Sequence, residues 1–397
     1  MKILFVSLSG SIHTSRWISQ IEDNKWELYL FPSQDNFWIN NKLNSVNYCI
    51  PNWWIYQLSL KFNAGNIFKI VYKIFAAFFL FLDKKYYEKR LFKYIKRIKP
   101  DVIHSMETQA GGYLVDSIKI NYFKSSNFPI WWHANWGSDI FIFGRIDEHK
   151  NRIKSVLRNC DYYSCECQRD VRLALEFGFK NDLLDVYPNS GGISMQIIDQ
   201  INSIAALTST RKIIMLKGYQ GWAGRALVGL RALTRCREIL NGYTVVIYTN
   251  TNAEDIKVAS SLFLNDTGIP VVLLKEHSDY QTILSYHAKA RISIGLSIGD
   301  AISTSMLEAM SVGSFPIQSN TSCADEWIED GVSGFIVPPE DPEIIELAIR
   351  RAIIDDKLVD EASRVNKVKI REEISFDNLK IKTVESYLKL HKKKRNE

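Results

Sequence analysis

Short apolar runs alternate with longer amphipathic segments along the whole chain. Runs such as KILFV at 2–6 and TVVIY at 244–248 are apolar on nearly every position rather than on every second one. Strands that helices cover on both faces of a parallel sheet have this pattern. Between the runs lie segments with helical periodicity, such as RALVGLRALTRCREIL at 225–240 and DYQTILSYHAKA at 279–290. The alternation predicts α/β architecture with parallel sheets.

The predicted strands fall into two groups, and the strand–helix alternation restarts at Lys212. A length of 397 residues suits two domains. We therefore expect two doubly wound, Rossmann-like domains at 1–205 and 206–375, followed at 376–397 by a helix and basic tail that packs back toward the first domain. The strands are expected at 2–8, 25–32, 101–106, 128–134, 160–166, 184–189, 212–219, 244–250, 270–276, 291–297, 314–319 and 334–338.

Composition narrows the class of protein. Hydrophobic residues make up 46% and charged residues 24%, as in soluble globular chains. The formal charge of +6 is too small to indicate a nucleic-acid partner. Cys165 and Cys167 are too close in sequence for a usual zinc site, and the scattered cysteines favour a reducing cytoplasm. The N-terminus has no signal-peptide cleavage pattern and fits a first strand better.

One segment suggests contact with a membrane surface. No apolar run approaches the roughly 20 residues needed to span a bilayer, and the nearest is IFAAFFLFL at 74–82. Lys, Arg and aromatic residues flank it on both sides, within 69–99. This mixture suits a helix that lies on an anionic membrane surface. The alternative is a buried helix followed by a solvated basic one, and both remain open at this stage.

Polar residues that follow predicted strands are the candidates for ligand binding, because open α/β sheets bind ligands beyond the carboxyl ends of their strands. After the strand at 291–297 the chain reads GDAISTSMLEAMSVG, which predicts a helix start near Ser303 and a helix end at Gly313. A helix N-terminus suits a phosphate. The spacing of Ser305 and Glu308 also fits a capping box, in which Glu308 would only close the helix start.

The wider pattern from Asp300 resembles a known signature. The chain reads D-x7-E-A-M-x2-G-x2-P-I and continues as EWIEDGVSGFIVPPEDPE. This resembles the C-terminal signature of retaining glycosyltransferases of family four, which have the GT-B fold of two facing Rossmann-like domains. The family usually has Glu where this chain has Asp300.

The resemblance implies roles for the residues around this helix start. Glu308 would bind the ribose hydroxyls, because an ionised carboxylate accepts hydrogen bonds from a diol. Asp300 would lie by the donor sugar, with one methylene less reach than Glu. The helix start would support the diphosphate, and its hydroxyl residues are Ser303, Thr304 and Ser305.

The diphosphate also needs cations, which the family supplies as G-R-x4-K-G after the first strand of the second domain. The corresponding stretch is MLKGYQGWAGRALVGL, with Tyr219 in place of Arg and Gly224 in place of Lys. The basic residues left are Lys217 and Arg225. Arg225 opens a predicted helix and can contact phosphate through two parallel hydrogen bonds. The alternative is that both basic residues lie in a surface loop.

Two segments of the first half also resemble the family. SLSGSIHTSRWISQI follows the first predicted strand, and WWHANWGSDI follows a later one. The resemblance implies that Gly10 lies by the donor and His133 near the reacting sugar. We expect His133, Asp300 and Glu308 to be catalytic. The acceptor-side candidates are His13, Arg16, His104, Glu107 and Asp139. Of these, His104 and Glu107, in the segment HSMETQAGG at 104–112, match the family less specifically.

These observations predict a retaining glycosyltransferase that moves a sugar from a nucleoside-diphosphate sugar to a hydroxyl of a surface polysaccharide or lipid-linked glycan. In the family, attack is thought to occur from the face of the departing diphosphate. No D-x-D motif follows a strand, so we expect no divalent metal and no cofactor besides the nucleotide-sugar substrate. The expected location is the cytoplasm, free or peripheral at the inner face of the membrane. The alternatives are an epimerase of the same fold and a non-catalytic relative that binds a partner glycosyltransferase.

Overall fold

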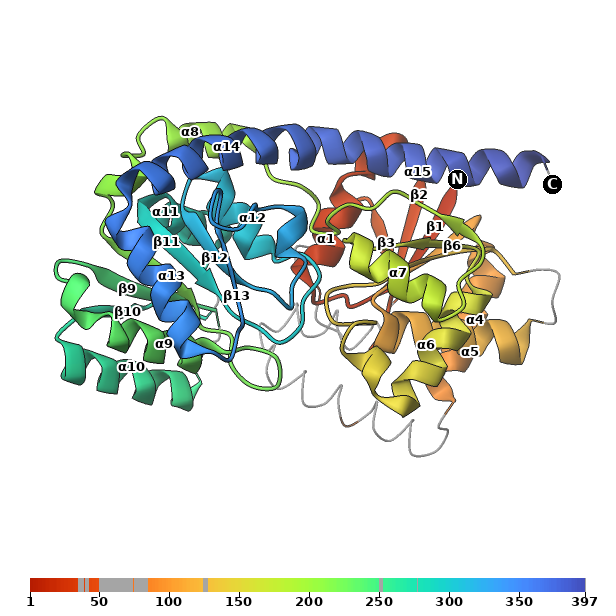
Figure 1. Ribbon diagram of the computed structural model, residues 1–397. Coiled ribbons are helices and arrows are strands. Elements are labelled where there is room, and N and C mark those ends of the chain that lie inside the picture. Colours follow the sequence, from red (N-terminus) through yellow and green to blue (C-terminus); the bar gives the residue numbers. More distant parts are fainter. Residues whose placement is uncertain are drawn as a thin grey trace. The chain divides into compact units, whose positions relative to one another are not determined.

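The computed structural model describes residues 1–34, 39, 43–49, 74, 85–123, 128–249, 253–276 and 278–396. The chain divides into two compact units (Figure 1). The N-terminal unit comprises Met1–Gly192 together with Leu379–Glu397, and the C-terminal unit comprises Ile193–Asn378. Each unit contains one parallel sheet with its own helices.

The sheet of the N-terminal unit has seven strands among the described residues, in the order β3-β2-β1-β4-β5-β6-β7. All neighbours pair in parallel, so that Ile3 lies beside Leu28 on one side and Val102 on the other. The strands are β1 Lys2–Ser7, β2 Glu27–Pro32, β3 Val46–Tyr48, β4 Val102–Met106, β5 Ile130–Ala134, β6 Tyr162–Ser164 and β7 Asp182–Leu183.

Helices cover both faces of this sheet. One face packs against α4 Tyr86–Ile98, α5 Tyr113–Tyr122 and α6 Asp147–Asn159, whose buried residues join Trp131 and Tyr163 in one hydrophobic core. On the other face lie α1 Ile12–Ser19 and α15 Phe376–Asn396, where Trp17 and Tyr387 are completely buried. Helix α7 Gln168–Glu176 and the π-helix Thr108–Gly112 complete the unit, with short 3-10 turns at Glu22–Asn24 and Phe143–Arg145.

The C-terminal unit has the same plan, and its described residues form six strands in the order β10-β9-β8-β11-β12-β13. They are β8 Ile213–Lys217, β9 Thr244–Tyr248, β10 Val271–Leu273, β11 Ala290–Gly295, β12 Phe315–Ser319 and β13 Phe335–Val337. Helices α9 Ala226–Arg235, α10 Glu254–Thr267 and α13 Pro342–Ile354 share the larger core. The other face packs against α11 Tyr280–Lys289 and α12 Thr304–Ser311, beside which lie α8 Met195–Asn202 and α14 Asp356–Ile374.

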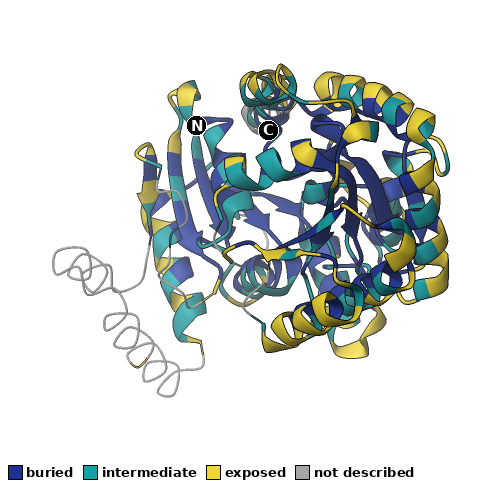
Figure 2. Ribbon diagram, turned by 90° about the vertical axis from the view of Figure 1, so that its left-hand side faces the viewer, coloured by how far each residue is buried: buried dark blue, intermediate teal, exposed yellow. Residues whose placement is uncertain are grey.

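Burial follows this layering. The strands of both sheets are buried along most of their length, while the outward faces of the helices are exposed (Figure 2). Four consecutive residues of β1, Ile3 to Val6, are 0% exposed. This accounts for the continuous apolar runs in the sequence, because both sides of each central strand are covered.

Both sheets reverse their strand order beside the first strand, between β1 and β4 and between β8 and β11. This is the doubly wound topology, and the prediction of two such α/β domains is confirmed. At a reversal the two neighbouring strands continue to opposite faces of the sheet, so ligands bind beyond their carboxyl ends. The segments at these points are the loop 8–11 and Glu107 with the π-helix Thr108–Gly112 in the N-terminal unit, and the loops 218–225 and 296–303 in the C-terminal unit.

Two strand predictions differ from the structure. The strand expected at 184–189 is wrong, since β6 pairs with Asp182 and Leu183, and Pro188 cannot donate to a ladder. The short edge strand β3 was not expected, because VNY carries little apolar signal.

The segment expected to contact a membrane lies largely outside the described residues, which omit 50–73 and 75–84. Its basic second half forms α4. Within the described ranges, no helix has the length and the apolar character that crossing a bilayer requires.

Candidate functional site

The residues with the clearest sequence signal meet at the strand reversal of the C-terminal unit. The loop after β8 and the loop after β11 are joined by backbone hydrogen bonds, from Arg225 N to Leu296 O at 3.0 Å and from Ile298 N to Ala223 O at 2.9 Å. Gly218 begins the first loop, and a Cβ there would lie 2.5 Å from Thr249 O, so only glycine fits. The two loops therefore form one surface at the carboxyl ends of β8 and β11.

Helix α12 begins in this surface. Ser303 occupies the N-cap position without a side-chain cap bond, and the helix itself starts at Thr304. Ser305 is therefore an interior residue of the first turn, and the capping-box interpretation of Ser305 and Glu308 is wrong. The Ser303 and Ser305 hydroxyls lie 3.0 Å apart at the helix start. Hydroxyl groups beside a helix N-terminus can bind an anion together with the backbone N–H groups.

Glu308 lies one turn into α12 and is 8% exposed. Its charge acts on Tyr248, the last residue of β9. Burial raises the pKa of the Tyr248 hydroxyl, a hydrogen bond with Ser305 opposes that shift, and the Glu308 carboxylate adds to it. Tyr248 at the end of β9 is therefore sensitive both to the Glu308 carboxylate and to the Ser305 hydroxyl of α12.

Asp300 and Tyr219 approach each other from the two joined loops. Burial raises the pKa of Tyr219, and the Asp300 carboxylate raises it further. Asp300 Oδ1 also accepts a hydrogen bond from Ala301 N at 2.9 Å. The ammonium of Lys217 lies 5.8 Å from the centre of the Tyr219 ring. Over the described part of the chain, Lys217 forms no ion pair.

Arg225 is already occupied by another partner. Its Nε donates to Glu340 Oε1 at 2.7 Å, and a terminal nitrogen donates to Gly224 O at 2.8 Å. The carboxylate of Glu340 is well exposed, with 63% of its side chain accessible. For Arg225 to bind phosphate, the guanidinium has to exchange Glu340 for the ligand.

In the N-terminal unit, the loops after β1 and β5 meet. Helix α1 begins at Ile12, and the Ser11 hydroxyl caps it by accepting from His13 N at 3.2 Å. The His13 ring contacts Trp136 edge-to-face, with 5.8 Å between centroids. Gly10 lies in the loop before the helix, and Arg16 packs against Gly191, where a Cβ would lie 2.6 Å from Arg16 Cβ.

Two buried carboxylates follow β4 and β5. Glu107 accepts hydrogen bonds from Ala110 N and Gly111 N, while Asp139 accepts from Thr108 N at 2.7 Å and from Trp136 N at 2.8 Å. Burial raises the pKa of Glu107 to about 7. Burial and the charge of Glu107 raise the pKa of Asp139 to about 8. The two groups are close enough to oppose each other's ionisation.

Of the three predicted histidines, His104 and His133 are completely buried. His133 contacts Ser105 Oγ at 2.9 Å through Nδ1 and Thr108 Oγ1 at 3.1 Å through Nε2, and burial lowers its pKa to about 3. His104 lies in the middle of β4, stacked on Trp132 at 4.0 Å, and its Nδ1 is 2.6 Å from the Tyr387 hydroxyl. Burial lowers the pKa of His104 well below its usual value. Both rings are therefore neutral, and contact of His133 with a sugar would require one of its hydrogen bonds to open.

The structure thus gathers the C-terminal candidates more closely than the N-terminal ones. Asp300, Ser303, Ser305, Glu308 and Lys217 belong to one surface, as does Thr304 at the first position of α12. Sequence reasoning missed Tyr219 and Tyr248 as members of it. Tyr248 ends β9 and Tyr219 lies two residues after β8, and that position at the strand ends was the available signal.

Comparisons with known proteins agree with this fold. No curated protein matches the chain in sequence. Residues 269–368, which include Asp300 and Glu308, match the family described as glycosyl transferases group 1.

Several solved structures superpose over nearly the whole chain. Sucrose-phosphate synthase from Thermosynechococcus elongatus has a TM-score of 0.72 at 12% identity, covering 98% of this chain and 99% of that one. HepE from Anabaena, in complex with UDP-glucose, has a TM-score of 0.68 at 12% identity, covering 98% of this chain and 100% of that one. For α,α-trehalose 6-phosphate synthase from Burkholderia multivorans the TM-score is 0.68 at 10% identity, with coverage of 100% and 99%.

These likenesses identify the fold as GT-B, with two Rossmann-like units. The family match adds that residues 269–368 are similar to the glycosyl transferases of group 1.

Proposed function

We propose that the protein is a retaining glycosyltransferase that moves a sugar from a nucleoside-diphosphate sugar to an acceptor hydroxyl. The observation that supports this most is the grouping of Glu308, Asp300 and the α12 N-terminus at one strand reversal. A nucleoside-diphosphate sugar has a diol, a double anion and a neutral sugar in series. The grouping offers a carboxylate, a helix N-terminus and a second carboxylate, which match those three parts.

In the proposed donor complex, Glu308 accepts hydrogen bonds from the ribose diol. The α12 N-terminus, with Ser303 and Ser305, binds the diphosphate, and Lys217 supplies positive charge. Lys217 is the better placed cation, because Arg225 is paired with Glu340. Asp300 accepts from a hydroxyl of the donor sugar.

The proposed reaction proceeds on one face of the donor sugar. The acceptor oxygen bonds to the anomeric carbon as the bond from that carbon to the phosphate oxygen breaks. The acceptor proton passes to the departing phosphate oxygen, so the configuration is retained without a protein nucleophile. The chain supplies charge and orientation, which act where the leaving group becomes more negative. The proposal includes no resident metal or cofactor, so turnover should survive dialysis against EDTA.

On the acceptor side we propose His13, Arg16 and Asp139, which lie on the loops after β1 and β5. Glu107 and His133 act through hydrogen bonds that hold these loops. For His104 we propose a structural role, because it is enclosed by Trp132 and Tyr387. The acceptor class that we propose is a surface polysaccharide or a lipid-linked glycan.

The direct test is a donor screen. Thermal melting should shift with one of UDP-glucose, GDP-mannose or ADP-glucose, and incubation with glycan acceptors should then give a product whose anomeric configuration is that of the donor. An epimerase would convert the donor sugar without any acceptor. A non-catalytic relative would bind a nucleotide without turnover. Failure of every nucleotide sugar to shift the melting temperature would contradict the proposal.

Glu308 gives the sharpest residue test of the donor site. Glu308→Gln should weaken the nucleoside diphosphate by about tenfold or more, because a charged hydrogen bond to the ribose is worth roughly 1.5–3 kcal/mol. Asp300→Asn should lower turnover with less effect on the free nucleoside diphosphate. Normal diphosphate affinity in a folded Glu308→Gln protein would remove Glu308 from the ribose site.

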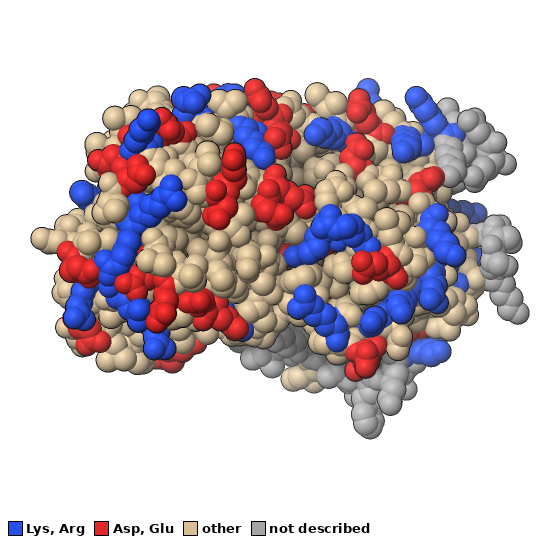
Figure 3. All heavy atoms as spheres, viewed as in Figure 1, with Lys and Arg blue, Asp and Glu red and all other residues tan. Residues whose placement is uncertain are grey.

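We also propose peripheral attachment to an anionic membrane surface through the N-terminal unit. The solvent face of α4 exposes Lys85, Lys89, Lys93, Lys96 and Arg97, while Leu91, Ile95 and Ile98 are buried. Each basic residue near an anionic surface contributes about 1 kcal/mol. Lys and Arg also spread over the face of this unit that Figure 3 shows.

Cosedimentation with vesicles of phosphatidylserine and phosphatidylcholine tests the attachment. Binding should require the anionic lipid and should weaken with salt. Replacing Lys85, Lys89, Lys93 and Lys96 by Gln should release the protein, while the pair Lys150→Gln and Lys154→Gln on α6 should release it less. A wild-type protein that stays in the supernatant at low salt would refute the proposed attachment.

A further inference from the structure

Helix α12 begins at the proposed diphosphate site, and side chains from a distant part of the C-terminal unit hold its other end. They belong to residues 202–211, the segment that connects α8 to β8. Asn202 Nδ2 donates to Ser311 O at 3.1 Å, and Thr208 Oγ1 donates to Gly313 O at 2.7 Å. Carbonyl groups at the end of a helix lack partners within the helix, so these side chains fix the last turn of α12.

Arg211 ties the same end of the helix to the strand that precedes it. Its Nη1 donates both to Ala290 O at 3.3 Å and to Val312 O at 3.1 Å. Ala290 is the first residue of β11, and Val312 is the C-cap residue of α12. One guanidinium nitrogen therefore sets the spacing between β11 and α12 at the end opposite to the loop 296–303, which belongs to the donor surface.

We call the side chains of Asn202, Thr208 and Arg211 the α12 clamp. Thr208 and Arg211 are buried, with 2% and 5% exposure. Ser209 anchors the segment on α14, because its backbone N and its hydroxyl donate to the carboxylate of Asp360 at 2.9 and 2.7 Å. Breaking a buried hydrogen bond leaves a polar group unpaired, so the clamp resists displacement.

A short helix that is fixed at one end is oriented at the other. Helix α12 has eight residues, which corresponds to a length of about 12 Å. The positive charge of Arg211 also lies at the C-terminal end, where the helix dipole is negative. A rotation of α12 about this end would carry the Ser303 and Ser305 hydroxyls out of hydrogen-bond reach of a phosphate.

We propose that Asn202, Thr208 and Arg211 are positioning residues for the donor diphosphate, which act through α12 without touching the ligand. The inference rests on the proposed function and extends it to a segment remote from the donor surface. It predicts that a loosened clamp weakens diphosphate binding in a protein that is still fully folded.

Thr208→Val is the first test, because it removes the hydroxyl and keeps the shape of the side chain. Thr234→Val is the matched control, since Thr234 Oγ1 also donates to a carbonyl oxygen, Leu230 O at 2.9 Å, but on α9. Calorimetry is done well below the melting transition with UDP, GDP or ADP, whichever binds the wild-type protein. Thr208→Val should weaken this ligand about three- to tenfold, and Thr234→Val less than about twofold.

Arg211 allows a graded test. Arg211→Lys keeps the charge but not the planar set of donors, whereas Arg211→Met removes both. The affinity for the nucleoside diphosphate should therefore fall from wild type to Arg211→Lys and further to Arg211→Met. A role in folding alone would lower the melting temperature of these variants without this order of affinities.

Hydrogen–deuterium exchange gives a readout that needs no nucleotide. In Thr208→Val the amides of the first turns of α12, such as those of Met306 and Leu307, should exchange several-fold faster, although the lost hydrogen bond lies at the other end of the helix. In Thr234→Val the faster exchange should remain within α9.

The outcomes separate the inference from the function on which it rests. Normal diphosphate affinity in a folded Thr208→Val protein would overturn the inference and leave the proposed function intact. Equal loss of affinity in Thr208→Val and Thr234→Val would do the same, because general destabilisation would explain it. Unchanged exchange in the first turns of α12 would show that the clamp does not reach the donor end, and would also overturn it. A wild-type protein that binds none of the three diphosphates would overturn both.

Discussion

Glu107 and Thr249 occupy backbone conformations that residues with side chains rarely adopt. Their φ angles are 66° and 62°, and each follows the carboxyl end of a strand. The backbone strain is greater at Thr249, because a β-branched side chain crowds the backbone at positive φ. Glu107 offsets its strain by accepting two backbone N–H groups. Strain of this type concentrates at functional sites.

Thr249→Gly should stabilise the C-terminal unit. Relief of strain should raise the free energy of unfolding by about 1–3 kcal/mol. The greater conformational freedom of glycine in the unfolded chain should lower it by about 0.5–1 kcal/mol. The net rise in unfolding free energy should therefore be about 1 kcal/mol, measured by urea denaturation. Thr244→Gly, on strand backbone at the start of β9, is the control and should destabilise. A loss of stability in both variants would show that Thr249 is not strained.

Glu340 controls the availability of Arg225. Glu340→Gln removes the carboxylate that holds the guanidinium, so Arg225 becomes free to meet a phosphate. The affinity for a nucleoside diphosphate should rise several-fold, and its dependence on salt should steepen. Glu343→Gln, which alters the nearby partner of Arg235, is the control. Unchanged affinity in Glu340→Gln would place Arg225 outside the phosphate site.

Single residues also mark the limit of what the sequence could predict about the site. Asp300, Ser303 and Glu308 are close in sequence, so their spacing on a strand, loop and helix start was enough to group them. Tyr248 joins them only because β9 lies two strands from β11 in the folded sheet. The Arg225–Glu340 pair likewise depends on packing between distant segments. Side-chain partners of this kind have no local signal.

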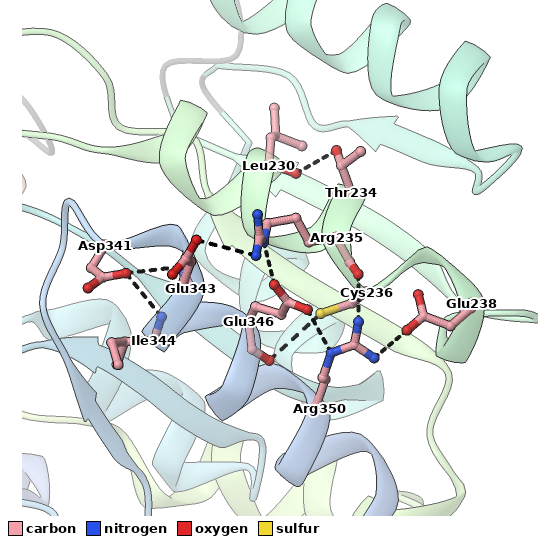
Figure 4. A network of polar contacts seen from close by, with 10 residues as sticks. All are labelled: Leu230, Thr234, Arg235, Cys236, Glu238, Asp341, Glu343, Ile344, Glu346 and Arg350. Carbon is pink, nitrogen blue, oxygen red and sulfur yellow. Dashed lines mark hydrogen bonds and ion pairs between the residues drawn. The ribbon is translucent and has the colours of Figure 1, made fainter.

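Among the elements, α9 and α13 are joined by a network of ion pairs (Figure 4). Arg350 on α13 contacts Glu346 on its own helix, Glu238 after α9, and the carbonyl oxygen of Arg235. Arg235 in turn contacts Glu346 and Glu343. The charged groups are partly exposed, so the network depends on geometry and on several contacts acting together.

Arg350→Met should lower the urea midpoint of the C-terminal unit, and the difference from wild type should shrink in 1 M salt because exposed ion pairs are screened. Arg231→Met on the outward side of α9 serves as the control, since it removes an exposed charge outside the network. An effect of Arg350→Met that is the same at low and high salt would indicate lost packing instead of lost charge.

The Tyr387 hydroxyl is one of the groups that hold helix α15 to the N-terminal unit. Tyr387 accepts from Trp17 Nε1 at 3.0 Å and contacts His104 Nδ1. Tyr387→Phe leaves buried polar groups without partners, which costs about 1–3 kcal/mol. Urea denaturation followed by tryptophan fluorescence should report this loss, while Tyr243→Phe is the control. A neutral Tyr387→Phe would contradict the structural role proposed for His104.

At the scale of the whole molecule, buried ionisable groups set how stability depends on pH. The folded state holds protons on Glu107 and Asp139 up to about pH 7 and pH 8, whereas the unfolded chain releases them near pH 4. Their contribution to stability is therefore present at low pH and is lost as pH rises through the folded pKa values. Buried His133, with a folded pKa of about 3, acts in the opposite direction but only below about pH 6.5.

Between pH 6.5 and 8.5 the carboxyl groups of Glu107 and Asp139 determine whether stability rises or falls with pH. The melting temperature of the N-terminal unit should fall over this interval, as followed by tryptophan fluorescence. Asp139→Asn should flatten the slope, whereas Asp147→Asn, at an exposed position of α6, should not. A melting temperature that is flat or rising in the wild-type protein would mean that Glu107 and Asp139 ionise normally.

The whole fold was more predictable than its details. Continuous apolar runs identify buried parallel strands, and their spacing leaves room for a helix between each pair, which predicts the doubly wound order of both sheets. The two edge strands of the N-terminal sheet were not predictable, because β3 and β7 contain only three and two residues. Such short strands depend on their neighbours more than on their own sequence.

The N-terminal unit is assembled from two stretches of chain, Met1–Gly192 and Leu379–Glu397, with the complete C-terminal unit between them. During synthesis the first stretch leaves the ribosome long before Tyr387 does. Until then Trp17, His104 and Trp132 lack the helix that covers them, and we expect them to present an aromatic surface open to chaperones and to aggregation. The C-terminal unit, continuous in sequence, can fold while the ribosome is still adding residues. The unit encoded first is therefore the one that finishes folding last.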